Sequence, residues 1–130
     1  MANLVANMQM STLNSAIDTI SFSLQKKREE LIRLQKALAE LTEIKSEFIE
    51  NEQMTREPEL TAANWHGKHA NQFKQIQQII QNDYHDLSDK QLNQKIRDIE
   101  AAIEKLKAEI AMLEASLSSA RQALSSLRSS

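Results

Sequence analysis

A single glycine and a single proline occur in this chain of 130 residues, and both lie near its midpoint, at Gly67 and Pro58. These two residue types mark turns most strongly, so the rest of the sequence offers almost no material for a multi-stranded sheet. Ala, Leu, Ile, Glu, Lys, Gln and Ser dominate, which is typical of long helices and coiled coils. The sequence therefore predicts an all-α chain that bends near Pro58 and Gly67.

On both sides of the bend, apolar residues recur at alternating steps of three and four, the pattern of a coiled-coil seam. We predict one long antiparallel helical hairpin forming a single domain, with a first arm over about 10–55, a bend over about 56–67 and a second arm over about 68–128. The expected seam of the first arm is Leu13, Ile17, Ile20, Leu24, Lys27, Leu31, Leu34, Leu38, Leu41, Lys45 and Phe48. That of the second arm is Leu92, Ile96, Ile99, Ile103, Leu106, Ile110, Leu113, Leu117, Ala120, Leu124 and Leu127.

Lys27 and Lys45 interrupt the first seam. A lysine there can set the register or the choice of partner, at a cost in stability. We favour the simpler interpretation, in which the stem packs and the amine reaches solvent.

The second arm carries another apolar stripe, out of phase with the seam that begins at Leu92. Its members are Phe73, Ile76, Ile80, Tyr84 and Leu87. The segment from Ser88 to Gln91 matches a capping box, which could start a new helix. The second arm is therefore either one helix with a phase slip or two helices broken near Asp86–Ser88. We favour one helix, because no Gly or Pro lies there.

Four apolar residues of the first arm fall off its seam: Phe22, Ile32, Ile44 and Ile49. Since a two-helix hairpin buries one stripe per helix, they suggest that a partner adds further helices. The alternative is that the helix drifts relative to a strict heptad.

No chemistry-bearing motif is present. The sequence lacks a nucleophile elbow, a phosphate loop and an HExxH motif, so we predict a non-enzyme without a cofactor. Cysteine is absent, and His85 lies four to five helical turns from His66 and His69, too far for a three-histidine metal site. A net charge of −2 argues against nucleic-acid binding.

The first residues show no export or membrane signal. No Lys or Arg occurs from Ala2 to Ile17, and polar residues interrupt this stretch, so we expect neither a cleavable signal peptide nor stable membrane insertion. The sequence predicts a cytoplasmic chain, or one exported by a route that reads no cleavable peptide.

The block from Trp65 to Phe73 reads Trp-His-Gly-Lys-His-Ala-Asn-Gln-Phe and follows a heptad arm. It resembles the YwqH-like family, small helical proteins that belong loosely to the WxG superfamily of type VII secretion and neighbour LXG-type toxins. The resemblance implies that Trp65 and Gly67 shape the hairpin tip and contact a partner, with Phe73 completing the motif. The Tyr-x-x-x-Asp/Glu export signal of many WxG proteins is incomplete, because Ser88 stands four residues after Tyr84.

The resemblance implies an adaptor or targeting chaperone that binds the helical N-terminal region of an LXG-type toxin, with a second small helical protein as a further candidate partner. The alternatives are a self-associating structural coiled coil and an immunity protein. The last would need a sculpted face with strong charge complementarity.

Overall fold

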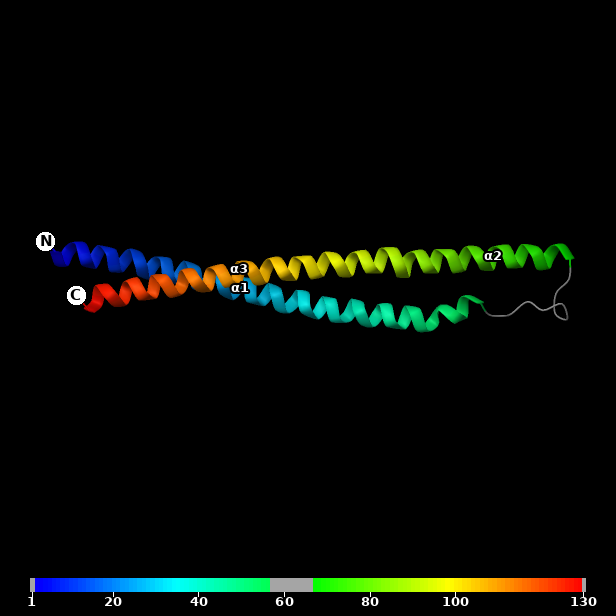
Figure 1. Cartoon of the computed structure of the whole chain (residues 1–130), viewed down its shortest axis with the longest axis horizontal. Helices are drawn as coiled ribbons and strands as arrows, with labels where there is room; N and C mark the ends of the chain where they lie inside the picture. Colours follow the sequence, from blue (N-terminus) through cyan, green and yellow to red (C-terminus); the bar gives the residue numbers. More distant parts are fainter. Residues whose placement is uncertain (1, 57–66, 130) are drawn as a thin grey trace. The chain divides into compact units, whose positions relative to one another are not determined.

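The computed structural model describes residues 2–56 and 67–129. Along the chain these form helix α1 (Ala2–Glu50), the 3-10 helix η1 (Asn51–Arg56), helix α2 (Gly67–His85), the π-helix η2 (Asp86–Leu92) and helix α3 (Asn93–Ser129) (Figure 1). Every described residue is helical, which confirms the predicted all-α class. Pro58 and the motif residues Trp65 and His66 lie outside the described residues.

Residue contacts divide the chain into two units. The first unit contains residues 1–35 and 101–130, and pairs the beginning of α1 with the greater part of α3. The second unit contains residues 36–100, and pairs the end of α1 and η1 with α2, η2 and the beginning of α3. Within each unit the two segments run antiparallel (Figure 1). The packing of α1 against α3 confirms the predicted helical hairpin.

In the first unit, the core follows the heptad positions. Leu24 is 1% exposed and is the most deeply buried side chain of α1. Opposite it, α3 contributes the buried residues Ile103, Leu106, Ile110 and Leu124. Half-buried neighbours on the same positions extend this strip, among them Leu13, Ile17, Ile20, Leu31, Leu34, Leu113, Leu117 and Leu127. In the second unit the corresponding seam residues are half-buried, namely Leu38, Leu41, Phe48, Leu92, Ile96 and Ile99.

In the second arm, the π-helix η2 separates the α-helices α2 and α3 and accommodates the change of phase between them. A π-turn accommodates one extra residue, which rotates the preceding helix by about 100° relative to the following one. Ser88, the first residue of the capping box, is 4% exposed inside η2 and starts no new helix. The α-helical pattern of the second arm is therefore broken at η2, as predicted near Asp86–Ser88, and the arm stays helical through this break.

The rotation sets which face of α2 packs inward, and it corrects the predicted stripe. Phe73 and Tyr84 are half-buried, but the other three members, Ile76, Ile80 and Leu87, are exposed. The buried and half-buried positions of α2 and η2 instead include Ala70, Phe73, Gln77, Gln81, Tyr84 and Ser88. Helix α2 thus directs two glutamines towards the protein and leaves isoleucines outside.

Candidate functional site

The described part of the predicted tip motif consists of Gly67 and Phe73. Gly67 opens α2 with φ +75°, a conformation that glycine adopts without steric cost. Among the described residues, no atom lies within 4 Å of a Cβ added there, so the constraint seen at this position is the backbone angle. Phe73 is half-buried on the inward side of α2.

Phe48 and Tyr84 join α1 to α2 within the second unit. Their rings stack with centroids 3.8 Å apart and an interplanar angle of 18°. The Tyr84 hydroxyl also donates a hydrogen bond to the backbone carbonyl of Phe48. That carbonyl lies in the last turn of α1, where helices leave carbonyl groups for other donors. One side chain therefore supplies both apolar packing and a cap.

His85 carries the connection further, to η1 and η2. Its Nε2 atom lies 2.8 Å from Glu52 Oε1, and its Nδ1 atom lies 3.1 Å from Asp89 Oδ2.

Burial raises the pKa of Tyr84, and the nearby negative charge of Glu52 raises this pKa further. Glu52, Tyr84, His85 and Asp89 thus form one polar cluster around the end of α2.

In the first unit, two ion pairs cross from α1 to α3. Lys27 Nζ lies 2.5 Å from Glu109 Oε2, with both side chains one-third exposed, and Arg28 contacts Glu114 at 3.1 Å. The hydrogen bond from Lys27 lowers the pKa of Glu109; burial opposes this shift, and the charges of Lys27 and Lys105 add to it. The seam lysine therefore packs its stem and pairs its amine with α3, which favours one register of the two helices.

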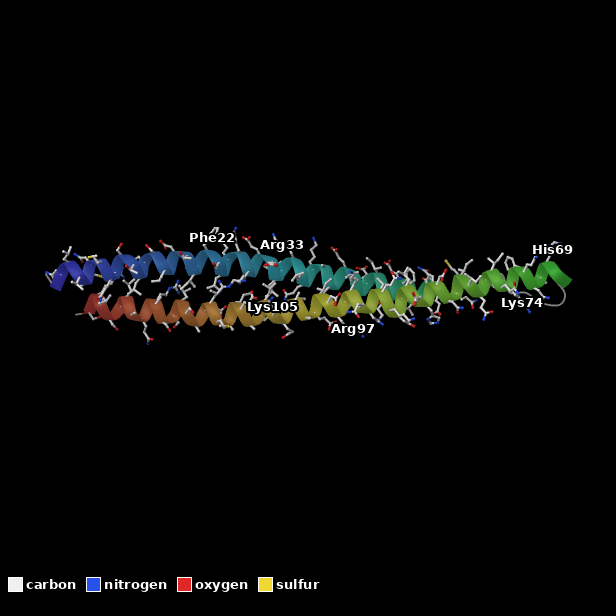
Figure 2. All side chains as sticks on the ribbon, turned by 90° about the horizontal axis from the view of Figure 1, so that it is seen from above. Phe22, Arg33, His69, Lys74, Arg97 and Lys105 are labelled. Carbon is white, nitrogen blue, oxygen red and sulfur yellow. The ribbon has the colours of Figure 1, made fainter. Side chains whose placement is uncertain are left out.

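Large apolar side chains of α1 that lie outside its seam remain exposed. They include the four off-seam residues and three near the beginning of the helix, namely Leu4, Val5, Met8, Phe22, Ile32, Ile44 and Ile49. Figure 2 shows Phe22 pointing away from α3. An open, largely apolar groove of about 570 Å³ lies in the first unit, lined by Val5, Met8, Gln9, Thr12, Leu13 and Leu127. These surfaces suit contacts with another helix.

Two further features, metal-ligand clusters and membrane-spanning helices, can be checked in the described ranges. No three His, Cys, Asp or Glu side chains among residues 2–56 and 67–129 come together as metal ligands. Within the same ranges, no helix is sufficiently long and apolar to cross a bilayer. What the described surface offers is helical faces with exposed aliphatic side chains.

These observations define the class of the molecule, a helical hairpin with coiled-coil seams and exposed apolar side chains. Over residues 8–129 the sequence matches the model of the YwqH-like family. The chain belongs to the YwqH-like family. Comparison with curated proteins and with solved structures finds no significant match in either.

Sequence reasoning missed the cluster that joins Phe48, Glu52, Tyr84 and His85. These residues are distant along the chain, and only the pairing of the two arms brings them together. A partial signal was present, because Phe48 ends the first seam and Tyr84 lies on the stripe of the second arm. Ile79, exposed on α2, was also missed, since it belongs to neither predicted stripe.

Proposed function

We propose that this protein is a non-enzymatic adaptor that binds the helical N-terminal region of an LXG-type toxin and assists its delivery to a type VII secretion machine. Membership of the YwqH-like family gives the context. The observation that carries the proposal is the exposed apolar surface of α1. A pair of helices covers only one stripe on each helix, so side chains outside the seam such as Phe22 and Ile32 stay exposed. A further helix from a partner would cover them.

The binding surface would be helical on both sides. Amphipathic helices dock by placing apolar residues into a complementary apolar surface, and the groove between Val5 and Leu127 offers such a surface in the first unit. The partner chemistry expected from this surface is an amphipathic helix with an aliphatic stripe. Trp65 and Gly67, at the tip, are proposed as further contact residues.

The test is co-expression of the full chain with the N-terminal helical half or the C-terminal half of the neighbouring LXG toxin, followed by measurement of the mass of any complex. We expect a complex with the N-terminal half alone. A complex with the C-terminal half alone would indicate an immunity protein. Self-association without toxin binding would indicate a structural coiled coil. Either result would contradict the adaptor.

A pair of double variants locates the surface. Phe22→Asp with Ile32→Asp places charge on two exposed apolar positions of α1, and we expect at least tenfold weaker toxin binding. Gln25→Asp with Gln35→Asp adds the same charge at exposed polar positions of the same helix, and should bind nearly as the parent does. Equal losses in both variants would show that added charge, and not the apolar face, is responsible.

A further inference from the structure

A regular stripe runs along the outward flank of α2 into η2. Its members recur at alternating steps of three and four residues and are His69, Gln72, Ile76, Ile79, Asp83 and Asp86; Asp86 is half-buried and the other five are exposed. The two central isoleucines are 56% and 58% exposed, and Ile80 beside them is 50% exposed. The off-seam residues Phe22, Ile32 and Ile44 of α1 form no such stripe, since they lie ten and twelve residues apart.

The charge along this stripe changes from one end to the other. His69, a nitrogen donor, stands at the beginning, Gln72 follows, and the two acidic residues Asp83 and Asp86 stand at the end. From Gln75 to Asn82 the sequence contains no charged residue. Depletion of charge around a central apolar patch is characteristic of the core of a protein interface.

The order of residue types makes the stripe complementary to itself when two copies run antiparallel. If Ile76 of one copy faces Ile79 of the other, Gln72 faces Asp83 and His69 faces Asp86. Both central positions are then apolar, and each carboxylate meets a side chain that can donate a hydrogen bond. A parallel pairing would place Asp83 against Asp83 and Asp86 against Asp86, and like charges at such positions are destabilising.

We propose that the stripe from His69 to Asp86 is a homodimer interface, occupied by the same stripe of a second copy in antiparallel orientation. Such an interface is isologous, with each contact made twice about a two-fold axis. Asp86 already contacts Lys90 at 3.1 Å, but a carboxylate has acceptor capacity for a second donor. Stable interfaces bury about 800 Å² on each partner. A stripe with two or three isoleucines buries less, so the dimer should be weak and concentration-dependent.

Cysteine crosslinking tests the register directly, because the natural chain contains no cysteine. In the proposed dimer, position 72 faces position 83 of the second copy, whereas the two copies of position 72 lie about 16 Å apart along the axis. Full-length Gln72→Cys mixed with full-length Asp83→Cys should therefore form a disulfide-linked dimer at least tenfold faster than Gln72→Cys alone, since the bridge requires close Cβ atoms. Equal rates, or faster linkage of Gln72→Cys to itself, would overturn the proposal.

Sedimentation of the full chain supplies the second measurement. We expect the full chain to form reversible dimers with a dissociation constant below about 1 mM. Ile79→Lys should associate at least tenfold more weakly. Its new amine would lie one turn from Asp83, so the helix itself should stay stable. Ile44→Lys is the control, an exposed isoleucine of α1 between Glu40 and Glu47, and should associate as the parent does. Gln72→Lys should tighten the dimer about threefold through two symmetric pairs with Asp83. A chain that stays monomeric throughout this range, or a loss in Ile44→Lys equal to that in Ile79→Lys, would overturn the inference.

Discussion

The Tyr84 hydroxyl donates a hydrogen bond to the backbone carbonyl of Phe48 while the two aromatic rings stack. This relationship joins the last turn of α1 to the last turn of α2. It exists because η2 rotates α2 so that Tyr84 packs inward. The cluster that continues through Glu52 and His85 therefore depends on the π-helix as much as on the side chains themselves.

Truncating the most buried positions of the first unit should destabilise the protein strongly. Ile103→Ala and Leu106→Ala each remove a side chain with little exposure, and should lower the free energy of unfolding by about 2–5 kcal/mol in urea denaturation. Ile99→Ala, at a half-buried position of the second unit, should cost less. Ile32→Ala, at a side chain that is 64% exposed, is the control and should change stability by less than about 0.5 kcal/mol. Values near zero at Ile99, Ile103 and Leu106 would show an exposed seam.

Removing the Tyr84 hydroxyl should weaken the second unit and change its response to alkaline pH. The pKa of Tyr84 in the folded protein lies above the ordinary tyrosine value of 10.0, mainly through burial and then through the negative charge of Glu52. The neutral hydroxyl therefore contributes stability that is fully present below pH 10 and is lost as the pH rises through the folded-state pKa. Tyr84→Phe should unfold at a lower urea concentration than the parent. It should also lack the part of the stability loss at alkaline pH that comes from ionisation of Tyr84.

The control for that experiment is Tyr84→Ala, which removes the stacked ring as well and should unfold earlier than Tyr84→Phe at neutral pH. Because Tyr84 is the sole tyrosine, tyrosinate absorbance in a pH titration reports its ionisation directly. An ionisation midpoint at or below the ordinary value would contradict the burial seen here.

Lengthening the second arm by one residue in η2 should rotate α2 away from its present packing. Insertion of one Ala after Gln91 would turn the preceding helix by about 100° relative to α3, and would take Tyr84 and Phe73 off the inward face. We expect a loss of about 3 kcal/mol or more, comparable with truncation of a buried aromatic side chain. Insertion of one Ala after Ser129, outside the helical pairing, is the matched change of length. Unchanged thermal melting of the variant with the insertion after Gln91 would mean that η2 does not set the phase of α2.

Gly67→Ala should destabilise the start of α2 through the backbone alone. At φ +75° an L-residue costs about 1–2 kcal/mol, and no atom of the described residues would clash with the new methyl group. Gly67→Asn should cost less than Gly67→Ala, because asparagine tolerates this region better. Urea denaturation of both variants measures the difference. Equal stability of the three proteins would show that this angle is not maintained in solution.

Trp65→Ala should weaken toxin binding more than it unfolds the chain. Tryptophan is a frequent anchor of protein interfaces, and truncation of a central one commonly costs about 2 kcal/mol or more of binding energy. Thermal melting of the isolated variant is compared with its affinity for the N-terminal region of the toxin. A variant that melts much earlier and binds with unchanged affinity would assign Trp65 to folding.

Much of the architecture was readable from local pattern. The scarcity of Gly and Pro, together with two heptad seams, led to the helical hairpin, and the change of phase between Leu87 and Leu92 marked where η2 lies. The family followed from the block between Trp65 and Phe73, and the match over residues 8–129 confirms it. Periodicity succeeds here because a long amphipathic helix repeats the same local choice many times.

The inward face of α2 could not be read in the same way. Its sequence favours a stripe containing Ile76 and Ile80, yet Gln77 and Gln81 are the half-buried positions and the isoleucines are exposed. The rotation of α2 depends on how η2 distributes an extra residue and on the contact of Tyr84 with Phe48, which lies 36 residues away along the chain.

The sequence by itself determined the helices, their seams and the family, because these follow from residue spacing within one segment. Only the tertiary structure decided the phase of α2, the cluster around Tyr84 and His85, and the pairing of Lys27 with Glu109. These features depend on which side chains the second arm presents to the first, and packing between segments distant in sequence determines that choice.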